Sequence, residues 1–114
     1  MIQPMKKKSR KIKFEQLLED DSITLHKSKG NGILRRQVWV DNDGNVTRYS
    51  LAYINHLLYS GDNGRVLGFD NTHGYHHKHY MGNVEPVNFS NFLELEKHFQ
   101  REFEVLHAKV KKTR

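Results

Sequence analysis

The sequence predicts one small α+β domain, in which an antiparallel sheet of four to five strands forms a meander and a C-terminal helix packs on one face. Two observations carry this prediction. Strand-like segments follow one another between residues 22 and 81, with connections too short for parallel crossovers. After residue 86 the apolar positions change to a spacing of three and four. A length of 114 residues fits a single hydrophobic core.

Turn residues separate the predicted strands, which cover residues 22–27, 33–40, 46–54, 65–70 and 75–81. The second segment is rich in β-branched residues, and Asp43-Gly44 after it is a favoured hairpin dipeptide. In the third segment, Tyr49, Leu51 and Tyr53 alternate onto one face, which we expect to pack on the core. The first strand is expected to be short.

Two helices are predicted, one at each end of this sheet. The longer helix follows Pro86 and has an apolar stripe at helical spacing, formed by Phe92, Leu95, Phe99, Phe103 and Leu106. We expect it to cover one face of the sheet. At the other end of the chain, Phe14, Leu17 and Leu18 fit one face of a short N-terminal helix.

The formal net charge of +6 is unevenly distributed. Residues 1–13 contain six Lys and Arg and no acid, and residues 108–114 contain four more. Residues 14–107 contain nine Lys and Arg against thirteen Asp and Glu. We therefore divide the chain into a basic N-terminal tail, a mildly acidic domain over 14–107 and a basic C-terminal tail. Such tails either bind nucleic acid or an acidic partner, or only aid solubility.

Cysteine usage and hydropathy indicate a cytoplasmic protein. The chain has no cysteine, whereas a secreted domain of this size usually needs disulfides. No segment has the apolar run of a signal peptide or the length of a membrane span. We therefore expect a cytoplasmic location and no membrane partner.

The segment 70–79 is where chemistry is expected, because it holds four histidines within seven residues. Histidine titrates near neutrality, so such a group favours proton transfer or metal binding. Strand alternation places Asp70, His77 and His79 on the sheet face opposite the core, together with Arg48. A register slip of one residue would place His76 and Lys78 there instead.

The same region resembles a known family. The resemblance rests, in chain order, on Arg48-Tyr49, Phe69-Asp70-Asn71, His76-His77-Lys78-His79 and Val84-Glu85-Pro86 before a helix. This pattern is similar to the TumE-like toxin family of bacterial type II toxin–antitoxin systems. It implies a small toxin that is neutralised by an antitoxin with a helix-turn-helix DNA-binding domain. The sequence departs from the family pattern in its short turn after Asn71, which holds His73, and in its long basic tails.

The first hypothesis is an RNA-cleaving toxin that uses no metal and no other cofactor. Cleavage by the 2′-hydroxyl needs a base, an acid and a cation that stabilises the phosphorane. His77 and His79 are the predicted base and acid, and Asp70 is predicted to orient an imidazole. His73 completes the predicted catalytic set. Contacts to RNA phosphates and bases are predicted for Arg48, Lys78, His76 and Tyr75.

Two alternatives stay open. Histidines at positions i and i+2 of a strand reach one ion, so His77, His79 and Asp70 are the alternative ligands of a catalytic metal. The other alternative is a non-catalytic module that grips nucleic acid or a protein. The expected partners are RNA and the antitoxin, which we expect to be acidic and to cover the histidine face. A homodimer is also left open.

Overall fold

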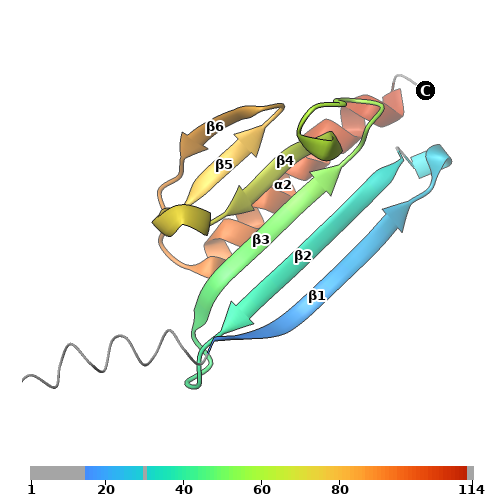
Figure 1. Cartoon of the computed structure of the whole chain (residues 1–114). Helices are drawn as coiled ribbons and strands as arrows, with labels where there is room; N and C mark the ends of the chain where they lie inside the picture. The colour runs from blue at the N-terminus through green and yellow to red at the C-terminus, as the bar shows by residue number, and fades with distance from the viewer. Residues whose placement is uncertain (1–14, 30, 113–114) are drawn as a thin grey trace, which may run out of the picture.

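The computed structural model describes residues 15–29 and 31–112, which form a six-stranded antiparallel sheet with one long helix across one face (Figure 1). The strands lie in the sheet in chain order, as a meander. They are β1 (Gln16–Leu25), β2 (Gly32–Val40), β3 (Val46–Ile54), β4 (Arg65–Asp70), β5 (His77–Tyr80) and β6 (Asn83–Pro86), and the helix is α2 (Phe92–Lys112). The predicted α+β meander with a C-terminal helix is confirmed, with six strands in place of four to five.

The predicted short N-terminal helix is wrong, because Leu17 and Leu18 lie in β1. This strand pairs with β2 along its whole length, with a bulge between Leu17 and Glu19. Both leucine side chains are exposed and do not pack on the core. A short group of closely spaced apolar residues fits a helix and a strand equally well, so the pairing with β2 determines that this segment is a strand. Phe14 and the predicted basic tail at residues 1–13 lie outside the described residues.

The strand missing from the prediction is β6, which pairs with β5 from Tyr80↔Asn83 to His77↔Pro86. The two residues between these strands, Met81 and Gly82, both have positive φ angles, of 46° and 89°. Two consecutive left-handed residues are what a tight type I′ hairpin requires. Met-Gly is not one of the dipeptides that indicate such a turn, so the sequence pattern did not reveal the hairpin.

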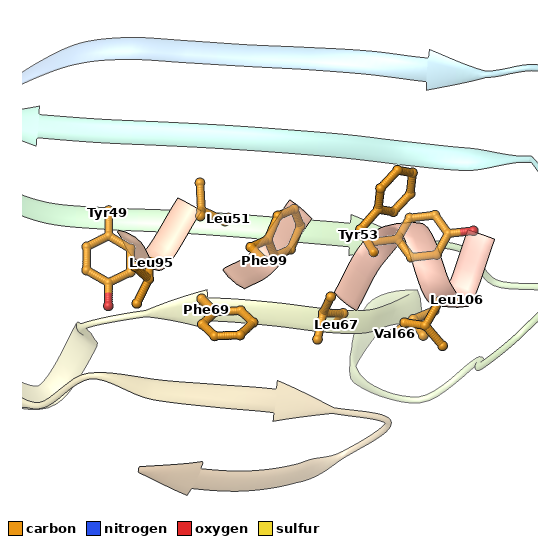
Figure 2. Packing of buried hydrophobic residues seen from close by; sticks show 10 residues of the cluster. Tyr49, Leu51, Tyr53, Val66, Leu67, Phe69, Leu95, Phe99 and Leu106 are labelled. Carbon is orange, nitrogen blue, oxygen red and sulfur yellow. The ribbon is translucent and has the colours of Figure 1, made fainter. Parts of the chain in front are cut away.

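The core lies between α2 and the strands β3 and β4 (Figure 2). The ring of Tyr53 meets Phe103 edge-on, with 5.0 Å between centroids, and Phe69 meets Phe99 in the same way at 5.9 Å. Edge-to-face packing of this kind adds to the free energy gained from burial. Because α2 uses only one face of the sheet, the polar residues that alternate with these core residues point to the other face.

We expect Leu95→Ala to lower the free energy of unfolding by about 2–5 kcal/mol, because it removes a side chain that is 5% exposed. Leu93→Ala is the matched control on the same helix, where the leucine is 59% exposed, and we expect a change within about 0.5 kcal/mol. Urea unfolding followed by circular dichroism measures both values. Equal effects of the two substitutions would contradict this description of the core.

Candidate functional site

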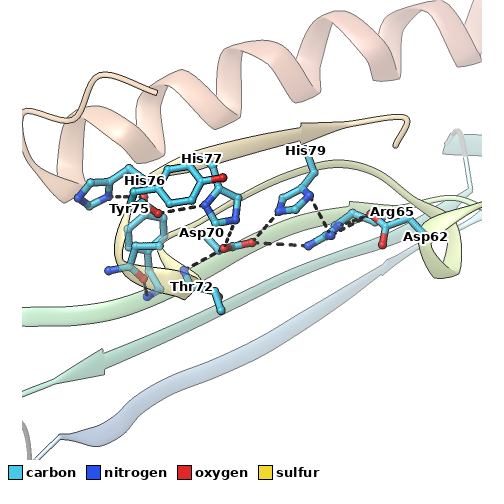
Figure 3. A network of polar contacts seen from close by, with 10 residues as sticks. Asp62, Arg65, Asp70, Thr72, Tyr75, His76, His77 and His79 are labelled. Atoms are coloured by element: carbon cyan, nitrogen blue, oxygen red, sulfur yellow. Dashed lines mark hydrogen bonds and ion pairs between the residues drawn. The ribbon is translucent and has the colours of Figure 1, made fainter. Parts of the chain in front are cut away.

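Asp70 lies at the centre of a polar cluster at the end of β4 (Figure 3). The β4–β5 register pairs Asp70 with His77 and Gly68 with His79, which places both histidines beside the carboxylate. Asp70 is 6% exposed and His77 is 4% exposed. Lys78, between the histidines, contacts Glu102 of α2, so the histidines lie on the opposite face of the sheet. The structure therefore brings Asp70, His77 and His79 together as strand alternation predicts.

The Asp70 carboxylate has a polar partner on each oxygen. Oδ1 accepts hydrogen bonds from the Thr72 backbone N–H at 3.0 Å and from His77 Nε2 at 2.8 Å. Oδ2 accepts one from His79 Nε2 at 3.1 Å and lies 3.6 Å from Arg65 Nη1. A buried carboxylate is costly unless it is paired and hydrogen-bonded, and these four donors meet that requirement. The arrangement therefore suits an ionised Asp70.

Both ring nitrogens of His77 face acceptors. Nε2 meets Asp70 Oδ1, and Nδ1 lies 3.0 Å from the backbone carbonyl oxygen of Tyr75. A carbonyl and a carboxylate only accept, so a ring that carries a proton on each nitrogen satisfies both contacts. The Tyr75 ring packs on this imidazole with 4.6 Å between centroids. His77 thus holds the buried Asp70 carboxylate in place, and both of its ring nitrogens are engaged in these two contacts.

His79 has the opposite hydrogen-bond pattern. Its Nε2 donates to Asp70, and its Nδ1 lies 3.1 Å from Arg65 Nη2. A guanidinium only donates, so Nδ1 carries the lone pair and the ring is neutral. Burial lowers the pKa of His79, and the positive charge of Arg65 lowers it further, against the opposing effect of Asp70. His79 is therefore the histidine of the cluster that is able to accept a proton.

Arg65 is the site residue that sequence reasoning missed. It bridges the cluster to Asp62, to whose Oδ2 its Nε donates at 2.8 Å. Simple alternation would place Arg65 on the core face, but the pairing steps from Tyr53↔Leu67 to Ile54↔Arg65 and leaves one residue unpaired. Such a β-bulge redirects a side chain, often beside a functional site.

Gly68 provides the space that Arg65 needs. A Cβ at this position would lie 2.7 Å from the Cδ of Arg65, so the arginine stem crosses the strand where a side chain is missing. A glycine inside a strand often marks a bulge or a close approach. That glycine was the one sequence signal that could have revealed Arg65.

Two residues predicted to bind phosphate lie away from this cluster. The Arg48 Nε donates to Glu15 at 2.9 Å, and its guanidinium lies 4.0 Å from the centre of the Trp39 ring. The Lys78 Nζ lies 2.6 Å from Glu102 Oε1 on the helix face of the sheet. Neither cation is brought to Asp70, and Arg65 takes the place expected for Arg48.

The remaining predicted histidines, His76 and His73, lie outside the hydrogen-bonded cluster. His76 stacks on Phe89 with 3.8 Å between ring centroids, and its Nδ1 lies 2.8 Å from the Tyr49 hydroxyl. Burial, and then the neighbouring His77, lower the pKa of His76, while burial raises the pKa of Tyr49. The hydroxyl therefore donates to a neutral ring. His73 is exposed in a short turn at Thr72–Gly74, with no contact to the carboxylate.

The donor atoms of Asp70, His77 and His79 lie within 4.8 Å of one another, as a metal site would require. His77 suits a metal, since its Nδ1 is held by a carbonyl. His79 does not, because coordination through Nε2 would move its proton to Nδ1, against the Arg65 guanidinium. The positive charge of Arg65 also opposes a dication. As arranged here, these residues do not fit a metal ion.

Comparison with protein-family models finds a match to the model described as "Toxin TumE", over residues 6–109. The chain belongs to the TumE toxin family. The predicted resemblance is thereby confirmed, and the match includes the whole Asp70 cluster. Comparisons with curated proteins and with solved structures find no match. Membership in the TumE family supports a toxin role and implies an antitoxin partner.

None of the helices described for this TumE protein has the length and apolar character needed to cross a membrane.

We expect Arg65→Gln to raise the pKa of His79, because the substitution removes a positive charge that lowers it. An NMR titration of the imidazole resonances measures this pKa. Arg48→Gln is the matched control, since that guanidinium lies against Trp39 and Glu15. An unchanged or lower His79 pKa in Arg65→Gln would contradict the proposed contact between the two side chains.

Proposed function

We propose that this TumE toxin cleaves RNA through the 2′-hydroxyl group, with His79 as the general base. The observation that carries the proposal is the hydrogen-bonded series of Asp70, His79 and Arg65. A carboxylate on Nε2 orients the imidazole and stabilises the cation that forms when Nδ1 takes a proton. A guanidinium beside Nδ1 is suited to bind the phosphate that reacts there.

The proposed reaction begins when a phosphate of the RNA draws Arg65 away from His79. The freed Nδ1 takes the proton of the 2′-hydroxyl, whose oxygen attacks the adjacent phosphorus. Arg65 neutralises the charge that develops on the phosphorane. The bond to the 5′-oxygen then breaks, and the imidazolium of His79 returns the proton to that oxygen. The products are a 2′,3′-cyclic phosphate and a 5′-hydroxyl end.

His77 has a different role in this proposal from the one predicted from sequence. Both of its nitrogens are hydrogen-bonded, to Asp70 and to the Tyr75 carbonyl, so it holds the carboxylate in place. The base role predicted for His77 is therefore assigned to His79, whose protonated form keeps the acid role predicted for it. His73 lies outside the hydrogen-bonded series and has no part in the proposed reaction.

The alternative function is a toxin that acts by binding alone. It is favoured by the position of Arg65, whose guanidinium is hydrogen-bonded to His79 Nδ1. In this arrangement the lone pair of Nδ1 is not available to take a proton. The family implies an antitoxin partner on either account. That the antitoxin is acidic, carries a helix-turn-helix domain and covers the histidines stays a prediction.

Expression of the wild type should arrest growth and fragment cellular RNA, whereas His79→Ala should lower RNA cleavage by about 100-fold or more. Arg65→Ala should have a comparable effect, because the phosphorane charge loses its counterion. His26→Ala is the matched control, since His26 is exposed after β1, away from the cluster. Gel analysis of RNA from the cells and of purified RNA measures cleavage.

The same assay with EDTA separates the alternatives. Unchanged cleavage in EDTA supports acid–base chemistry, and loss of cleavage would overturn it in favour of a metal-dependent reaction. Growth arrest with intact RNA would overturn the nuclease proposal and favour a toxin that acts by binding alone or by modifying nucleotides without cleavage.

A further inference from the structure

A second cationic surface lies on the other face of β5. The helix α2 and the strand β5 enclose a groove of about 430 Å³. It is lined by Lys78 and Tyr80 from β5 and by His98, Arg101, Glu102, Val105 and Lys109, among others, from α2. We propose that this groove binds the phosphate backbone of single-stranded RNA, an inference that rests on the proposed action on RNA.

The charge balance of the groove supports an anionic ligand. Lys78, Arg101 and Lys109 are three permanent cations, whereas Glu102 is the single acid in the lining. Both oxygens of Glu102 are already engaged, by Lys78 Nζ at 2.6 Å and by His98 Nε2 at 2.6 Å. Glu85 lies opposite Lys78 in β6, outside the lining. The groove therefore keeps a surplus of positive charge.

Arg101 and Lys109 are the two cations available to a ligand. Neither forms an ion pair within residues 15–29 and 31–112, and both are exposed. They are eight residues apart in α2, which corresponds to about 12 Å along the helix axis. A chain of phosphates suits two separated cations better than one small anion does, because each cation meets a different phosphate.

The groove and the histidine site lie on opposite faces of the same strand, β5, because side chains alternate along it. Lys78 and Tyr80 face α2, while His77 and His79 face the other side of the same strand. Beyond β5 the sheet ends with β6, which has only four residues (Figure 1). An RNA strand held in the groove therefore reaches His79 by passing around this short hairpin. The groove would hold the substrate whose bond the other face cuts.

The test is the binding of a fluorescein-labelled single-stranded RNA of mixed sequence, followed by anisotropy at several salt concentrations. All proteins carry His79→Ala so that the RNA stays intact. Adding Arg101→Ala and Lys109→Ala together should weaken binding about tenfold at low salt. The slope of log K against log salt should also become less steep by about 1.4, since each of the two lost phosphate contacts accounts for about 0.7 on a single strand. Lys97→Ala is the matched control, an exposed cation of α2 outside the groove.

Equal binding by the double variant and its parent would overturn the groove proposal, and cleavage by the wild type would then still support the nuclease. Equal losses in the double variant and in Lys97→Ala would also overturn it, because any helix cation would then serve. A loss confined to the double variant supports the groove. If the loss is confined to the double variant but a separate incubation with the wild type leaves the same RNA intact, the groove stands and the cleavage proposal fails.

Discussion

The buried carboxylate of Asp70 is the constraint on which the rest of the site depends. A carboxylate removed from water must be compensated by donors, and here they come from three parts of the chain. The turn after β4 supplies the Thr72 N–H, β5 supplies two imidazoles and the start of β4 supplies Arg65. Losing any of these would leave part of a buried charge unpaired. The carboxylate thereby ties the β4–β5 register to the chemistry of the two histidines.

Two neighbouring histidines that contact the same carboxylate have different hydrogen-bond patterns. His77 is held between two acceptors, whereas His79 lies between an acceptor and a guanidinium donor. The difference comes from what each Nδ1 meets, a backbone carbonyl in one case and Arg65 in the other. In the proposed reaction, this difference makes His77 the positioning group and His79 the base.

The sequence predicted the parts of this arrangement that depend on local pattern. Alternation along β4 and β5 placed Asp70, His77 and His79 on one face, and the apolar stripe predicted α2. The sequence prediction failed where pairing with a distant segment determines the secondary structure. Leu17 and Leu18 lie in a strand, and not in a helix, because β1 pairs with β2. Arg65 reaches the site through a bulge and over Gly68, neither of which follows from period-two alternation. The roles of these residues in catalysis stay predictions.

The most direct test is the protonation of His79, measured by ¹⁵N NMR on the uniformly labelled protein near neutral pH. Because Nε2 donates to Asp70 and Nδ1 faces the Arg65 guanidinium, we predict a neutral ring with its proton on Nε2. A His79 ring with its proton on Nδ1, or with protons on both nitrogens, would contradict this hydrogen-bond pattern. Either result would remove the basis for assigning His79 as the base.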